Sequence, residues 1–154
     1  SPEFSCEARD ASNVTPQVFS MFNSQATMDR AVALAVRVVR DAGGGNRPAA
    51  LERLYRLAFG RNPSAAERNA SLAHWDAMTA RHARLNPEKP AYPRDVLREA
   101  VEENTGEKFS FREKLVVYEE FIPDTSLSDV DAVTRGLAEV CLVLFNSNEF
   151  AFVY

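Results

Sequence analysis

The residues best suited to bind a metal or to act as a nucleophile are few in this chain and lie far apart. The two histidines, His74 and His82, are separated by eight positions, so on one helix they would point about 80° apart instead of converging on a shared ion. The two cysteines, Cys6 and Cys141, form no CxxC or CxxCH unit, which excludes a zinc knuckle and covalent haem attachment. The sequence therefore predicts no catalytic residue, no metal site and no cofactor.

Each cysteine can still have a structural role. Cys141 lies in the apolar run Val140–Phe145, which favours a small residue of the core. A disulfide between Cys6 and Cys141 remains open if the natural protein is exported, because pairing depends on a spatial proximity that sequence does not show.

The polar residues near the two ends of the chain are the one candidate site. Phe22-Asn23-Ser24 is echoed by Phe145-Asn146-Ser147, each at the boundary of a helical segment. Asn and Ser side chains bond readily to the free backbone groups of helix ends, which favours two helix junctions. If the junctions are adjacent in space, they instead form a polar pocket floor. Its residues would be Asn23, Ser24, Asn146, Asn148 and Glu149.

Helical periodicity covers the first half of the chain. Residues 28–41 carry apolar side chains on one face and charged ones on the other, which predicts an amphipathic helix. Gly43-Gly44-Gly45 ends it, and a second helix follows from Pro48 to Gly60. Ser64 and Glu67 have capping-box spacing and predict a third helix to about Leu85. Its buried face is expected to contain Leu72, Trp75, Met78 and His82.

The second half is also predicted to be helical after a proline-rich connector over 86–93. We expect a helix from about Val96 to Gly106 and another over 110–122, although residues 108–112 also alternate like a strand. The last long helix, about 129–146, is apolar on all sides from Val140 onward. It should be central, flanked by the helices that begin near Ala26 and Ser64.

The fold class expected from these elements is all-α: one irregular bundle of about five to six helices over residues 5–154. Residues 1–4 are interpreted as a remnant of an expression vector. We expect Asn146, Ser147 and Asn148 to end the central helix. The aromatic residues Phe150, Phe152 and Tyr154 should then fold back over apolar surface, because monomers rarely leave such a strip in water.

Charge and hydropathy exclude two classes of partner. The net charge of -4 gives no electrostatic basis for binding nucleic acid. The longest apolar run has six residues, Val140–Phe145, far below the roughly 20 that a membrane-spanning helix needs.

Three stretches of the chain resemble a known family. They are residues 13–24, from Asn-Val-Thr-Pro to Phe-Asn-Ser; residues 53–64, which include Gly60-Arg61-Asn62-Pro63; and residues 137–150, with the ending Asn-Ser-Asn-Glu-Phe. Together they resemble the planctomycete-specific C-terminal domain of unknown function. The resemblance implies the end of a large, exported protein that carries a cytochrome-c-like domain upstream, and it assigns no catalytic residue.

Two functions from different classes are consistent with the sequence. In the first, the chain is a non-catalytic module that docks on upstream domains of its parent chain or on a surface protein. In the second, it contributes part of the substrate-binding site of a multidomain extracellular enzyme, with glycans as the substrate class and the Asn and Ser clusters as hydrogen-bonding groups.

Overall fold

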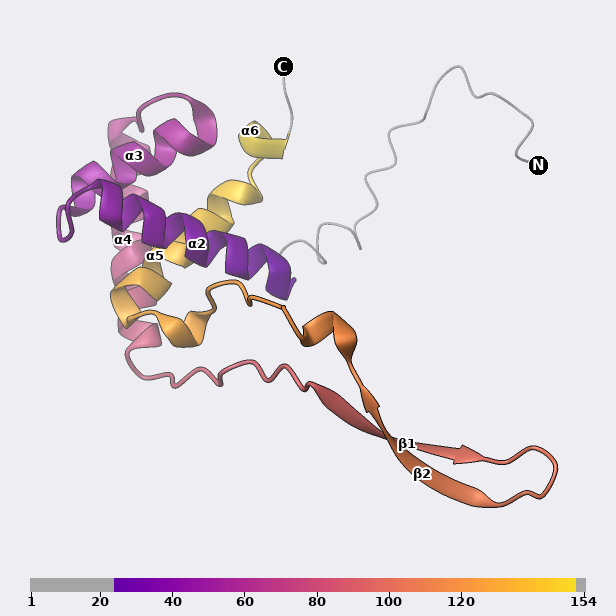
Figure 1. Cartoon of the computed structure of the whole chain (residues 1–154). Helices are drawn as coiled ribbons and strands as arrows, with labels where there is room; N and C mark the ends of the chain where they lie inside the picture. Colours follow the sequence, from indigo (N-terminus) through magenta and orange to yellow (C-terminus); the bar gives the residue numbers. More distant parts are fainter. Residues whose placement is uncertain (1–23, 152–154) are drawn as a thin grey trace, which may run out of the picture.

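The computed structural model describes residues 24–151 and shows a helical body with a β-hairpin that extends away from it (Figure 1). The body comprises α2 (Gln25–Asp41), α3 (Arg47–Phe59), α4 (Ala65–His82), α5 (Ala132–Phe145) and the short α6 (Asn148–Ala151). The hairpin consists of β1 (Asp95–Val101) and β2 (Lys108–Lys114), and the 3₁₀ turns η1 (Val116–Tyr118) and η2 (Leu127–Asp129) lead back to the body.

The first two helices form as their patterns predict. In α2 the buried residues are Ala31, Val32, Ala35 and Val38, all on one face. The turn after it uses three glycines with positive φ, a conformation that residues with a Cβ rarely adopt. Asn46 then caps α3 by accepting a hydrogen bond from Ala49 N at 3.1 Å.

The capping box predicted for the third helix is present. Ser64 Oγ accepts from Glu67 N at 3.3 Å, and the Glu67 carboxylate accepts from Ser64 N at 2.7 Å. Trp75 and His82 are buried, as predicted for the inner face of this helix. Leu72 and Met78 are only half-buried.

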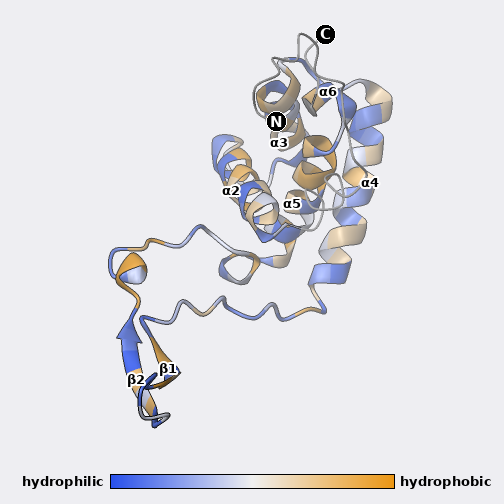
Figure 2. Ribbon diagram, turned by 90° about the vertical axis from the view of Figure 1, so that its right-hand side faces the viewer, coloured by the Kyte–Doolittle hydropathy of each residue, from blue (hydrophilic) through white to orange (hydrophobic). Residues whose placement is uncertain are grey.

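The last long helix is central, as predicted. Seven of its residues are buried, and it packs against α2 on one side and α4 on the other (Figure 2). Two features bring α4 and α5 together. Gly136 has no side chain where α5 crosses Trp75 and Thr79, and the Trp75 indole N–H donates to Val133 O at 2.8 Å.

The all-α prediction is wrong, because strands β1 and β2 of a two-stranded antiparallel sheet replace the helices expected over 96–106 and 110–122. The rest of the second segment forms no α-helix either, only the 3₁₀ turn η1. The apolar spacing of residues 111–122 fits a helix, but residues 111–114 pair with β1, and Val117 and Ile122 further along are 84% and 88% exposed. The turn between the strands decides instead: the Glu102 carboxylate accepts the N–H groups of Asn104 and Thr105, and Gly106 has φ 73°. The fold is therefore mixed, with helices and a small sheet.

An aromatic cluster closes the base of the hairpin. Tyr92 enters from the segment before β1, and Tyr118 and Phe121 from the segment after β2. Their ring centroids lie 5.0 to 6.3 Å apart. Within the described range 24–151, no helix is both long and apolar enough to cross a membrane.

Candidate functional site

The polar residues at the end of α5 terminate the helix. Asn146 Nδ2 donates to Leu142 O at 2.8 Å, and Ser147 Oγ donates to Leu144 O at 2.7 Å. The same two carbonyls also accept the backbone N–H groups of Asn146 and Ser147, at 3.2 and 3.0 Å, so the side chains reinforce the end of the helix. The prediction that this cluster ends the central helix is confirmed for Asn146 and Ser147, whereas Asn148 begins α6.

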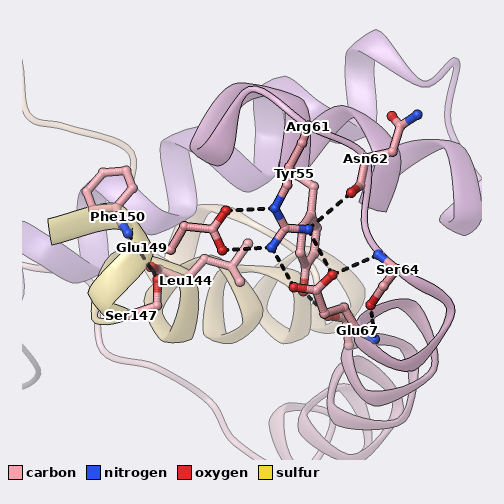
Figure 3. Close-up of polar contacts among 10 residues, drawn as sticks. Tyr55, Arg61, Asn62, Ser64, Glu67, Leu144, Ser147, Glu149 and Phe150 are labelled. Atoms are coloured by element: carbon pink, nitrogen blue, oxygen red, sulfur yellow. Dashed lines mark hydrogen bonds and ion pairs between the residues drawn. The ribbon is translucent and has the colours of Figure 1, made fainter. Parts of the chain in front are cut away.

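Glu149 belongs to a three-residue ionic cluster that links α6 to the loop between α3 and α4 (Figure 3). Its carboxylate accepts two hydrogen bonds from Arg61, both 2.7 Å long. The same guanidinium donates to the Glu67 carboxylate at 2.6 and 2.9 Å. One arginine therefore holds two carboxylates in a bidentate manner, and Glu67 simultaneously closes the capping box of α4.

The electrostatics follow from that arrangement. Hydrogen bonds from Arg61, and then from Ser64, lower the pKa of Glu67 to about 2. Arg61 also lowers the pKa of Glu149, and the two carboxylates raise the pKa of the guanidinium. All three side chains are partly exposed, so the cluster is ionised and internally paired at neutral pH. Such a group positions α6 instead of offering a free acid or base.

The N-terminal turns of α2 lie close to the α5–α6 junction. They line one open hollow of about 320 Å³, bounded by Ala26, Thr27, Arg30, Phe145 and Phe150. Ser24 is the N-cap of α2, but its side chain makes no capping bond. Asn23 lies outside the described residues, so the polar pocket floor stays a prediction.

The predicted aromatic tail is described only at Phe150. Its ring centroid lies 5.1 Å from that of Phe145, but the side chain is 44% exposed, so it contacts the body and covers it only in part. Phe152 and Tyr154 lie outside the described residues.

The histidines and the cysteine of the body do not form a metal site among the residues that the structure describes. His82 Nε2 lies 3.0 Å from Glu139 Oε1, and burial raises the pKa of the Cys141 thiol. Cys6 lies outside residues 24–151, so its pairing with Cys141 is untested.

The hairpin exposes large apolar side chains, a surface that the sequence patterns did not predict. Residues opposite each other in an antiparallel pair share a face of the sheet. One face therefore contains Val96, Arg98, Ala100, Phe109, Phe111 and Glu113. Phe109 and Phe111 are 49% and 45% exposed and stack with their centroids 6.0 Å apart. An open hollow of about 530 Å³ lies against residues 99–101 and 108–110.

The hairpin is also acidic. Between Tyr92 and Ile122 the chain has eight Asp and Glu residues and five Lys and Arg residues, a net charge of −3. Three of the glutamates, Glu102, Glu103 and Glu107, lie in the turn. Hydrogen bonds from Thr105, and then from Asn104, lower the pKa of Glu102 to about 2. The tip therefore combines fixed negative charge with aromatic surface close behind it.

Comparison with known proteins gives one family. Residues 1–75 match the model of a family described as PSD1, protein of unknown function (DUF1553). The match extends to Trp75 in α4, and the hairpin, α5 and α6 follow it in the chain. No curated protein matches the chain significantly, and no solved structure does. The comparisons support similarity to a family of unknown function.

Proposed function

We propose that this chain is a non-catalytic docking module of a longer, exported protein, and that its hairpin binds an upstream domain of that protein. The observation that carries the proposal is the aromatic face of a hairpin that extends from the helical body into solvent. The family resemblance, with its large exported parents, supports the choice of an upstream domain as the partner.

The hairpin is poorly stabilised by itself. An isolated two-stranded hairpin is marginally stable in water, and stable sheets have further strands or a covered apolar face. Among the described residues 24–151, the aromatic contacts of the hairpin with its flanking segments lie at its base, whereas Phe109, Phe111 and, on the opposite face, Leu97 are exposed. Contiguous exposed apolar surface of this kind marks interaction sites in monomeric proteins.

Charge defines the chemistry of the partner. The hairpin and its base carry a net charge of −3, and the turn contributes three glutamates and no basic residue. A complementary surface is therefore an apolar groove with Lys and Arg residues at its rim. Steering by these charges would increase the association rate and make it sensitive to salt.

The alternative, a glycan-binding contribution from the polar junctions, has less support. Asn146, Ser147 and Glu149 use their polar groups in bonds within the chain. The hollow beside them is lined mainly by apolar atoms, and the polar side chains among its lining residues are Thr27 and Arg30. Two polar side chains offer few hydrogen bonds for the several hydroxyls of a sugar.

Binding to the separately expressed remaining domains of the parent protein tests the proposal. In the double variant Phe109→Ser/Phe111→Ser we expect at least about tenfold weaker binding by calorimetry, because buried aromatic side chains dominate interface energies. The matched control, Val36→Ser/Val143→Ser, changes two exposed apolar residues on the helical body and should bind within about twofold of the unchanged chain.

Both variants should retain the melting temperature of the helical body, because neither removes a buried residue. Unchanged binding by the hairpin variant would refute the proposal, and so would an equal loss in both variants.

A further inference from the structure

Half of the backbone groups of the hairpin point away from it. Its two ends are marked by bonds from Leu115 N to Arg94 O and from Glu102 N to Glu107 O, both 2.8 Å long. Bonded and unbonded pairs alternate along an antiparallel ladder. Counted from these ends, the bonded pairs are Val96↔Glu113, Arg98↔Phe111 and Ala100↔Phe109. The residues between them therefore direct their N–H and C=O groups outward, to the two edges of the sheet.

The two edges differ in their side chains. The outward positions of β2 are Lys108, Ser110, Arg112 and Lys114. Charged residues at a strand edge, lysine above all, prevent pairing with another strand. The outward positions of β1 are Asp95, Leu97, Glu99 and Val101. Of these, Leu97 and Val101 are 61% and 56% exposed. The edge of β1, with two acidic residues, two exposed apolar residues and no lysine, is therefore less protected than the edge of β2.

Charge indicates what would lie beside β1. Arg112 donates to the Asp95 carboxylate at 2.5 Å, whereas Glu99 has no ion pair within the described part of the chain. A Lys or Arg opposite Glu99 would be a favourable cross-strand pair. On the other face, an apolar side chain opposite Arg98 or Ala100 would extend the surface of Phe109 and Phe111.

We propose that the outer edge of β1 receives an extended segment of the partner as a third strand, with basic residues on one face and apolar residues on the other. This inference rests on the proposed docking function and specifies its mode. Main-chain hydrogen bonds supply the affinity in such complexes, and alternate side chains supply the specificity. A third strand also provides what a two-stranded sheet lacks for stability.

A matched pair of prolines tests the edge. Glu99 and Ser110 are direct cross-strand partners, and both N–H groups point outward. Proline at either position removes one outward donor and no bond within the hairpin. With the parent's remaining domains, we expect Glu99→Pro to weaken binding at least about tenfold and Ser110→Pro to stay within about twofold.

Synthetic peptides test the chemistry directly. The probe is a capped heptapeptide that alternates Lys and Val, and its control has Glu in place of Lys. Amide hydrogen exchange of this chain is followed by NMR with each peptide. We expect the Lys peptide to slow exchange at Leu97, Glu99 and Val101 at least about tenfold and to leave Ser110 and Arg112 unchanged.

The outcomes separate this inference from the proposed function. The third-strand proposal is refuted if the Lys peptide protects β2 instead of β1, if it protects neither strand, or if the Glu peptide has an equal effect. It is also refuted if both proline variants lose binding affinity equally. If Phe109→Ser/Phe111→Ser weakens binding and Glu99→Pro does not, the hairpin docks through its aromatic face alone. In that case the docking function stands and the strand addition fails. If neither variant changes binding, both fail.

Discussion

Replacing Gly136 with alanine should destabilise the protein, although alanine is the better helix former. A Cβ at this position of α5 would lie 2.8 Å from Thr79 N and 3.0 Å from Trp75 O, and it would also contact Thr79 Oγ1. The hydroxyl can rotate, but the two backbone atoms move only with α4. Restoring ordinary contact therefore requires α4 and α5 to separate by roughly half an ångström.

Two effects of opposite sign decide the magnitude. Overpacking of this kind costs about 1–3 kcal/mol. The substitution also gains up to about 1 kcal/mol of helix propensity. Because separation also strains the Trp75–Val133 hydrogen bond, the cost should lie in the upper part of its range. We expect the free energy of unfolding to fall by about 1–2 kcal/mol.

Urea unfolding followed by circular dichroism measures this loss, and fluorescence of Trp75, the single tryptophan, reports on the contact itself. Ala77→Gly, at an exposed position of α4, calibrates the propensity term and should cost about 1 kcal/mol. Adding Thr79→Ala to Gly136→Ala should recover part of the loss, because it removes one of the three contacts. A Gly136→Ala variant that is more stable than the unchanged chain by the full propensity gain would refute the close-approach argument.

Three further results are expected. Leu137→Ala and Leu144→Ala should each lower the free energy of unfolding by about 2–5 kcal/mol in urea titrations, and losses below about 1 kcal/mol at both would show that α5 is not the core of the body. The pKa of Glu67 is about 2 in the folded protein and 4.5 in the unfolded chain. The contribution of ionised Glu67 to protein stability is therefore present above pH 4.5 and is lost as the pH falls toward 2. Glu67→Gln should therefore reduce the acid dependence of the melting temperature, and an unchanged dependence would contradict the role of Arg61. Elemental analysis and an absorption spectrum of the purified chain should show neither stoichiometric metal nor haem.

The helices of the body could be predicted because their signals are local. The apolar stripe of α2, the Ser64–Glu67 capping box and the apolar run from Val140 each occupy a few adjacent turns. These signals are determined by the same backbone and side-chain preferences in any context. In the folded protein, tertiary packing buries these helices and leaves the secondary structure that the local signals favour unchanged.

The hairpin was mispredicted because two periods coexist in one segment. Phe111, Leu115, Tyr118 and Ile122 recur at helical spacing, while Lys108–Arg112 alternates as a strand. Periodicity alone does not separate them. The turn around Gly106, with the Glu102 carboxylate bonded to the backbone of the next residues, is what pairs the strands.

The candidate site was only partly predictable, for a different reason. Glu149 could be named from its polar surroundings, but Arg61 is 88 positions away in the chain. Only the packing of α6 against the α3–α4 loop brings the two together. The position of Glu67 was also predictable, because the capping box places it in the first turn after that loop.

Contacts that hold the segments leading to the hairpin bear on the docking role proposed for it. Arg135 on α5 donates to Leu85 O at 3.2 Å and to His82 O at 3.4 Å, so the segment leaving α4 is held against the body. Further out, Tyr92 and Phe121 join the two segments at the base of the hairpin, with ring centroids 5.0 Å apart. Part of the entropy cost of ordering the hairpin is therefore already met by the fold before a partner binds. If a partner binds as proposed, only the exposed strands then lose further freedom, and this lowers the entropy cost of binding through two aromatic residues and one strand edge.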